Sequence, residues 1–215
     1  MDIRNITAKT PDADLSGDLA MGLDTSSVVL FAHGSGSSRH SPRNRAVAEA
    51  LNRSGFGTLL LDLLTEEEGR RDEVTRELRF DIPLLTRRLT GAVDWLTSAE
   101  ETAGLPIGLF GASTGAAAAL GTAAMRPDRI HAIVCRGGRV DLASEALGKI
   151  SAPLLLIVGS FDEPIVRISF QAQRELHVAS DVHLIPNATH LFEEPGALEQ
   201  VTGAAMGWFR DHMPK

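Results

Sequence analysis

Residues 106–120 read PIGLFGASTGAAAAL, and this stretch decides the fold. The apolar run before the first internal turn is typical of a buried strand, and the alanines at its end favour a closely packed helix. Between strand and helix, Ser113 is flanked at two residues' distance by Gly111 and Gly115. A serine on a very sharp strand-to-helix turn needs small residues there, because its backbone is strained and crowded. The pattern predicts an exposed serine at the carboxyl end of a strand, near the positive end of the following helix.

On both sides of this stretch, short apolar runs alternate with longer segments of helical spacing. The predicted strands, each expected to be buried on both faces, are Val28–Ala32, Gly57–Leu61, Pro106–Phe110, Ile130–Cys135, Pro153–Val158 and Val182–Ile185. The predicted helices are Arg43–Arg53, Ile82–Leu96, Thr114–Met125, Ile165–Glu175 and Ala197–Arg210. This alternation predicts an α/β fold with a single, mostly parallel sheet flanked by helices.

Two segments fall outside this alternation. Residues 1–26 contain two weakly strand-like stretches around a turn at Pro11, which predicts an antiparallel hairpin at the edge of the sheet. Residues 65–79 are crowded with charges of both signs and are interpreted as a solvated connection. No composition shift marks a domain boundary, so residues 1–215 are expected to form one domain.

A serine becomes a nucleophile only beside a base, and the base needs a third group to orient it. Asp162 follows a buried strand and a glycine turn, and His190 follows the next strand after a short loop. Both are expected at the carboxyl ends of parallel strands, the edge where open α/β sheets place their sites and where Ser113 also lies. We predict Ser113 as nucleophile, His190 as base and Asp162 as orienting acid.

Other residues compete for these roles. Asp141 is the main rival acid because it also follows a strand, and Glu163 is a weaker one. His33 precedes the serine and is expected to support a turn. His183 lies within a predicted strand, and three other histidines lie outside strand-end loops: His131, His177 and His212. All four are expected to be packing or surface residues.

A loop of glycine and serine, GSGSS at residues 34–38, follows the first core strand. Acyl transfer needs donors aimed at the negative oxygen of the tetrahedral intermediate, and backbone N–H groups serve best where no side chain intrudes. By position, the amides of Ser35 and Thr114 are the predicted donors. The alternative is a phosphate-binding loop, but the lysine of a P-loop is missing and the spacing does not match a dinucleotide fingerprint.

Composition excludes some other classes. The net charge of −7 disfavours nucleic acid or an anionic membrane as the main partner. Cys135 is the only cysteine, so neither an intrachain disulfide nor a cysteine-rich metal cluster can form. No apolar run approaches the roughly 20 residues of a membrane helix, and no signal peptide is recognised. A cytosolic protein is expected, with no metal or organic cofactor.

With these residues in place, the chain resembles the α/β-hydrolase superfamily, and most closely its small, lidless, dienelactone-hydrolase-like branch. The resemblance runs from HGSGSS at His33 through GASTG around Ser113 to ATHLF at His190. It implies a serine hydrolase. The dienelactone hydrolases that name the branch use a cysteine nucleophile, whereas this chain has Ser113, which favours a general carboxylic ester hydrolase. Only 17 residues, Arg136–Ala152, separate two predicted strands at the usual place of a lid, so no cap domain is expected.

An open site suits a small-molecule, short-chain or soluble ester. Thioester or lactone hydrolysis and acyl transfer would use the same triad, and a non-catalytic ligand receptor on a hydrolase fold is an alternative of another class. Arg136 and Arg139 follow a strand on the predicted active-site face. They are interpreted as salt-bridge partners that support loops, with recognition of a substrate carboxylate as the alternative. The oligomeric state is left open.

Overall fold

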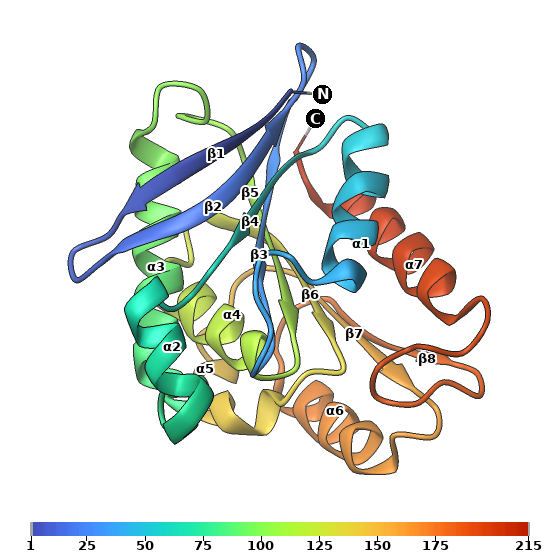
Figure 1. Cartoon of the computed structure of the whole chain (residues 1–215). Coiled ribbons are helices and arrows are strands. Elements are labelled where there is room, and N and C mark those ends of the chain that lie inside the picture. The colour runs from blue at the N-terminus through green and yellow to red at the C-terminus, as the bar shows by residue number, and fades with distance from the viewer. Residues whose placement is uncertain (1, 215) are drawn as a thin grey trace.

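The computed structural model describes residues 2–214 and consists of one eight-stranded sheet between two layers of helices (Figure 1). The strands lie in the order β1-β2-β4-β3-β5-β6-β7-β8. Their bounds are β1 Asp2–Lys9, β2 Asp14–Met21, β3 Val28–Ala32, β4 Gly57–Leu61, β5 Ile107–Ala112, β6 Ile130–Arg136, β7 Leu154–Gly159 and β8 Ser180–Ile185. The strands β1 and β2 form an antiparallel hairpin, β2 joins β4 in antiparallel register, and all later pairs are parallel.

The helices cover both faces of the sheet. They are α1 Pro42–Arg53, α2 Glu66–Thr75, α3 Ile82–Ser98, α4 Thr114–Met125, α5 Ser144–Leu147, α6 Glu163–Glu175 and α7 Ala197–His212, with 3₁₀ turns η1 Leu78–Phe80 and η2 Val140–Ala143. One core lies under α3, α4, α5 and α6, and a second lies under α1 and α7 (Figure 1). The predicted mostly parallel sheet flanked by helices is therefore confirmed.

The central strands are apolar because both of their faces are covered. Every residue of β3, β4, β5 and β7 is buried, as expected for parallel strands between two helical layers. The prediction was wrong for the last strand. β8 lies at the edge of the sheet, where Asp181, His183 and Leu184 are exposed and only Ile185 is buried. An edge strand has a neighbour on one side only, and this one is also incompletely covered by helices.

The charged segment 65–79, predicted as a solvated connection, is largely exposed, but it consists of a helix followed by a 3₁₀ turn. Thr65 begins α2 with a capping box: its hydroxyl accepts from the Glu68 N–H, and the Glu68 carboxylate accepts from the Thr65 N–H. At the other end, the buried Asp72 accepts hydrogen bonds from the amides of Leu78 and Arg79. The charges are therefore ordered by helix capping and by ion pairs.

The connection between β6 and β7 contains only η2 and α5. Within residues 2–214 there is accordingly no inserted cap over the carboxyl edge of the sheet, and no helix there is both long and apolar enough to cross a membrane.

Candidate active site

Ser113 occupies a strained turn between β5 and α4. Its backbone has φ +50° and ψ −120°, in a region that side-chain-bearing residues rarely adopt. A Cβ added at Gly111 would lie 2.5 Å from the Cα of Ala116, and one added at Gly115 would lie 2.5 Å from the carbonyl oxygen of His33. Both distances are shorter than real contacts allow, so only glycine fits two residues before and two residues after the serine. The sequence pattern around Ser113 therefore has a steric cause.

The tight packing at Gly115 predicts a large effect on stability. Gly115→Ala should lower the free energy of unfolding by about 3 kcal/mol or more, because the methyl group would meet the backbone of the β3–α1 loop. Gly203→Ala, on α7, is the control: nothing lies within 4 Å of the added Cβ, and the change should be neutral or stabilise by roughly 0.5–1 kcal/mol. Urea denaturation midpoints measure both effects, and equal midpoints for the two variants would contradict this account of the turn.

The structure brings His190 and Asp162 together. The His190 Nδ1 lies 2.6 Å from the Asp162 Oδ2, a short hydrogen bond between loops that follow β8 and β7. The Asp162 side chain is 11 % exposed and that of His190 is 38 % exposed, so the acid is sheltered and the imidazole is open to solvent. Asp162 is the N-cap of α6, but its side chain makes no capping bond and so remains free for the histidine.

Ser113 and His190 both border the end of β6. The Ser113 N–H donates to the Arg136 carbonyl over 3.1 Å, and a Cβ at the next residue, Gly137, would lie 3.3 Å from His190 Cε1. Among the hydrogen bonds of residues 2–214, none joins the Ser113 hydroxyl to the imidazole. Catalytic hydrogen bonds are often long in ligand-free enzymes and tighten when substrate binds, so this geometry is compatible with a serine–histidine relay.

The rival acids have other partners. Asp141 accepts from Arg139 Nε at 2.9 Å and Nη2 at 2.8 Å, and the Arg139 hydrogen bond lowers the pKa of Asp141 below its ordinary value. Glu163 is exposed and lies 3.7 Å from Arg167 on the next turn of α6. Neither carboxylate takes part in the hydrogen bond that His190 makes.

The glycine–serine loop lies against the serine turn. A Cβ added at Gly34 would lie 3.0 Å from the Ser113 Cβ, so the loop and the serine are in contact. Ser35 is half-buried and Thr114 is buried. Because Thr114 is the first residue of α4, its N–H has no partner within the helix and is available to a bound oxygen.

His33 orders the start of this loop. The Leu63 N–H donates to its Nε2 over 3.1 Å, so the proton is on Nδ1, which donates to the Gly34 carbonyl over 2.9 Å. Burial lowers the pKa of His33, and the Gly34 hydrogen bond and the Asp62 charge only partly offset this. A neutral His33 therefore ties the loop to the chain after β4 and is not available as the base for Ser113.

Arg136 at the end of β6 and Arg139 in the following loop have different surroundings. Arg139 pairs with Asp141, as the salt-bridge interpretation predicted. That interpretation was wrong for Arg136, which is 8 % exposed, lies 5.9 Å from the centre of the Phe192 ring, and has no carboxylate at ion-pair distance within residues 2–214. Burial, together with the nearby Arg43, lowers the pKa of Arg136 to about 10. The sequence does not predict this difference between the two arginines, because an arginine with an ion-pair partner and one without have the same sequence signature.

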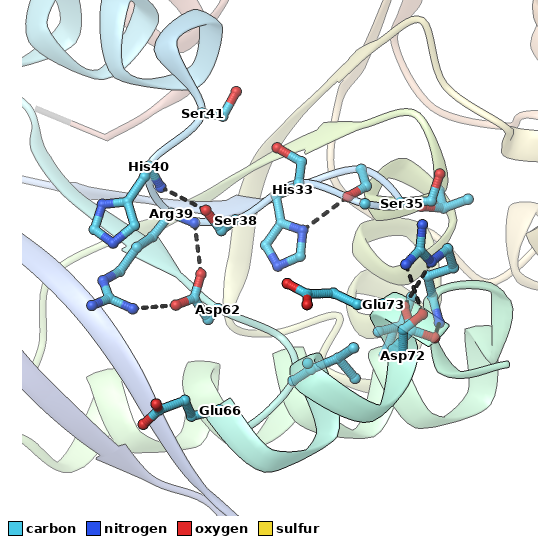
Figure 2. Close-up of a pocket in the computed structure, with 18 of the residues that line it drawn as sticks. His33, Ser35, Ser38, Arg39, His40, Ser41, Asp62, Glu66, Asp72 and Glu73 are labelled. Carbon is cyan, nitrogen blue, oxygen red and sulfur yellow. Dashed lines mark hydrogen bonds and ion pairs between the residues drawn. The ribbon is translucent and has the colours of Figure 1, made fainter. Parts of the chain in front are cut away.

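A cleft of about 850 Å³ opens beside the glycine–serine loop (Figure 2). Its walls are residues 33–42 on one side and α2 with η1 on the other, and it reaches Gly34 and Thr114 next to the serine turn. The sequence analysis missed the α2 wall. The Thr65-x-x-Glu68 capping signature was the signal that could have shown a helix there.

No metal-binding cluster accompanies this site. Among residues 2–214, no group of three or more His, Cys, Asp or Glu side chains is placed to hold a metal ion. Cys135 is fully buried, and burial raises the pKa of its thiol. The cysteine is therefore an apolar core residue and not a second nucleophile.

The strand order and the strand–serine–helix turn are those of an α/β hydrolase. The family described as serine aminopeptidase, S33, matches residues 24–182. The crystal structure of a dienelactone hydrolase from Anabaena variabilis ATCC 29413 is 49 % identical, with a TM-score of 0.98 over 99 % of both chains. The chain therefore belongs to this α/β-hydrolase family and is dienelactone-hydrolase-like.

Two further comparisons add context. Est1E from Butyrivibrio proteoclasticus is 18 % identical, with a TM-score of 0.80 over 96 % of this chain and 98 % of that one, which shows the shared fold. A Mycobacterium tuberculosis (strain H37Rv) protein, provisionally named a phosphoribosyl transferase, is 50 % identical over 199 residues, which are 93 % of this chain and 44 % of the relative. This chain thus spans less than half the length of that curated relative.

Proposed function

We propose that this protein hydrolyses a carboxylic ester through an acyl-enzyme intermediate, with Ser113, His190 and Asp162 as its catalytic triad. The observation that carries the proposal is the 2.6 Å His190–Asp162 hydrogen bond, made at the same edge of the sheet as a serine in the strained turn. The strained backbone of Ser113 and the sheltered carboxylate of Asp162 each cost folding free energy, which a catalytic role explains. A sheltered carboxylate bonded to a half-exposed imidazole, at the same sheet edge as a strained serine, is the arrangement that acyl transfer requires.

The proposed reaction has two steps. His190 Nε2 accepts the Ser113 hydroxyl proton while Ser113 Oγ attacks the ester carbonyl carbon, and Asp162 holds the proton on Nδ1. The Ser35 and Thr114 amides donate to the developing oxyanion. The tetrahedral intermediate then expels the alcohol, which takes its proton from His190. In the second step His190 removes a proton from water, which attacks the acyl carbon. As the bond from the acyl carbon to Ser113 Oγ breaks, His190 returns that proton to Oγ, and the acid is released.

Esters, lactones and thioesters all fit the same triad. Lactone hydrolysis is the second candidate, since the 49 % identical structure is named a dienelactone hydrolase. We further propose that the phosphoribosyl transferase name of the curated relative describes the part of that protein outside the match. The roles proposed for Ser113, His190 and Asp162 are those of acyl transfer, and none of them is a role in phosphoribosyl transfer.

Fluorophosphonate labelling tests the proposal directly. The purified protein should gain one covalent adduct, seen by intact mass and mapped to the peptide that contains Ser113, because the probe phosphonylates activated serines. Heat-denatured protein is the control and should gain none, because activation needs the folded triad. A folded protein that stays unlabelled and cleaves no ester, thioester or lactone would contradict the proposal and favour a non-catalytic ligand receptor.

A further inference from the structure

The cleft beside the glycine–serine loop is continuous with the proposed reaction centre. Gly34 and Thr114 line the cleft, and both adjoin Ser113: Gly34 through the close approach to its Cβ, and Thr114 as the next residue. When the carbonyl oxygen of a substrate meets the Ser35 and Thr114 amides, either its acyl part or its alcohol part can therefore extend along this cleft. The chemistry of the cleft walls then bears on which substrate is accepted.

Hydroxyl groups are frequent in these walls. The hydroxyl-bearing residues that line the cleft are Ser16, Ser35, Ser37, Ser38, Ser41, Thr65 and Thr114. Apolar side chains are few, with Leu64 and Leu85 the leucines present in the lining. An acyl chain of a lipid gains its binding energy mainly from apolar side chains, and few of these line the cleft.

The charges in the cleft balance. Four arginines and four carboxylates line it, and most are engaged with each other. Arg39 pairs with Asp62, and Arg79 Nε lies 2.6 Å from Asp72. In a third pair, Arg70 Nη2 lies 2.7 Å from Glu66. A site for an anionic or a cationic substrate would instead carry an excess of one sign.

A free acceptor and a free donor remain on the wall of the cleft that α2 and η1 form. Figure 2 shows the Glu73 carboxylate extending from α2 into the space opposite His33, with no hydrogen bond drawn to it. Asp72 holds Arg79 through Nε and Nη2, which leaves Nη1 beside Gly36 in the glycine–serine loop. A hydroxyl group both donates and accepts, so a ligand rich in hydroxyls can satisfy both.

We propose that this cleft binds a neutral, hydroxyl-rich part of the substrate, of the sugar or polyol class, with Glu73 as a specificity-determining hydrogen-bond acceptor. The proposal rests on the proposed ester hydrolysis and names its substrate class. Polar walls with balanced charge recognise hydroxyl groups and gain nothing from an alkyl chain of the same length.

Two series of esters test the proposal. The first keeps the acetyl group and changes the alcohol: ethyl acetate, 6-O-acetylglucose, O-acetylglycolate and acetylcholine. The second keeps methanol and changes the acid: methyl butyrate and methyl 3,4-dihydroxybutyrate. In at least one series the hydroxylated ester should have a kcat/KM roughly tenfold or more above that of the alkyl ester, as expected for hydrogen bonds to charged groups. The proposal would be overturned if 6-O-acetylglucose were not the preferred ester of the first series and methyl butyrate were preferred in the second.

Glu73→Ala and Glu67→Ala provide the matched pair of variants. Both remove one exposed carboxylate from α2, but only Glu73 lines the cleft. Glu73→Ala should lower kcat/KM for the favoured hydroxylated ester roughly tenfold and for the alkyl ester less than twofold. Glu67→Ala should change neither. Equal effects of the two variants, or equal losses on both esters, would overturn the role of Glu73.

Ligand binding separates this proposal from the proposed reaction. Saturation-transfer NMR on Ser113→Ala, with 6-O-acetylglucose and methyl 3,4-dihydroxybutyrate as probes, reports binding without turnover. Binding that is weakened by adding Glu73→Ala supports the cleft even if the wild-type protein cleaves no ester, an outcome that would refute the proposed function alone. Absence of binding by both probes, together with absence of any preference in turnover, would overturn the cleft proposal.

Discussion

Replacing Ser113 by alanine is expected to lower kcat for ester hydrolysis by about 10⁴–10⁶-fold, the largest effect of any single change in this protein. The variant loses only the Oγ atom that forms the acyl-enzyme. Whatever remains would come from the oxyanion donors and from substrate binding, which still act on a water molecule. Initial rates on a short-chain ester, with enzyme concentrations high enough to detect slow turnover, measure the loss.

The interpretation depends on the fold staying intact. Ser113 keeps its glycine neighbours in the variant, so thermal unfolding should be within a few degrees of the wild type. Ser98→Ala, at the exposed end of α3, is the matched serine control and should keep full activity. If Ser113→Ala retained a tenth of the wild-type rate while also losing fluorophosphonate labelling, the probe would mark a serine that the reaction does not need.

Asp162→Asn should have the second largest effect, a decrease in kcat of about 10⁴-fold. The Asp162 carboxylate accepts from His190 Nδ1 over 2.6 Å, which keeps the proton there and leaves Nε2 free to act as base. An asparagine can present its NH₂ group to Nδ1, and the imidazole then carries its proton on Nε2, where it cannot accept the Ser113 proton. KM should change much less than kcat, because the acid does not contact the substrate.

Asp141→Asn distinguishes the two candidate acids. Asp141 is held by Arg139 and not by His190, so its replacement should change kcat less than about threefold while slightly weakening the loop after β6. Parallel kinetics on the two variants decide between them. A large loss in Asp141→Asn with a small one in Asp162→Asn would transfer the role of acid to Asp141.

The strained serine turn and the alternation of strands and helices could be predicted from the sequence because both leave short patterns in it. Gly111 and Gly115 are required by contacts with atoms a few residues away or on the adjacent strand, and such contacts leave a short motif. Likewise, apolar runs separated by helical segments reflect burial on both faces of a parallel sheet. The candidate acid and base could be predicted because both follow strands that end at the same edge.

Other features have no local signature. β8 has the apolar content of a buried strand, but its place at the sheet edge leaves His183 and Leu184 exposed. Arg136 ends β6 and Arg139 follows three residues later, yet Arg139 pairs with Asp141 whereas Arg136 lies over the Phe192 ring. Position in the sheet and the identity of partners distant in the chain decide these outcomes.

By itself, the sequence determined the α/β architecture, the strained serine turn and the chain order of serine, acid and histidine, since backbone sterics and the burial period are properties of short segments. Only the tertiary structure decided that His190 meets Asp162 and not Asp141, that Arg136 lies over the Phe192 ring, and that α2 forms one wall of a polar cleft. The physical reason is that hydrogen bonds and ion pairs act over a few ångströms in space. They select among residues that are tens of positions apart along the chain.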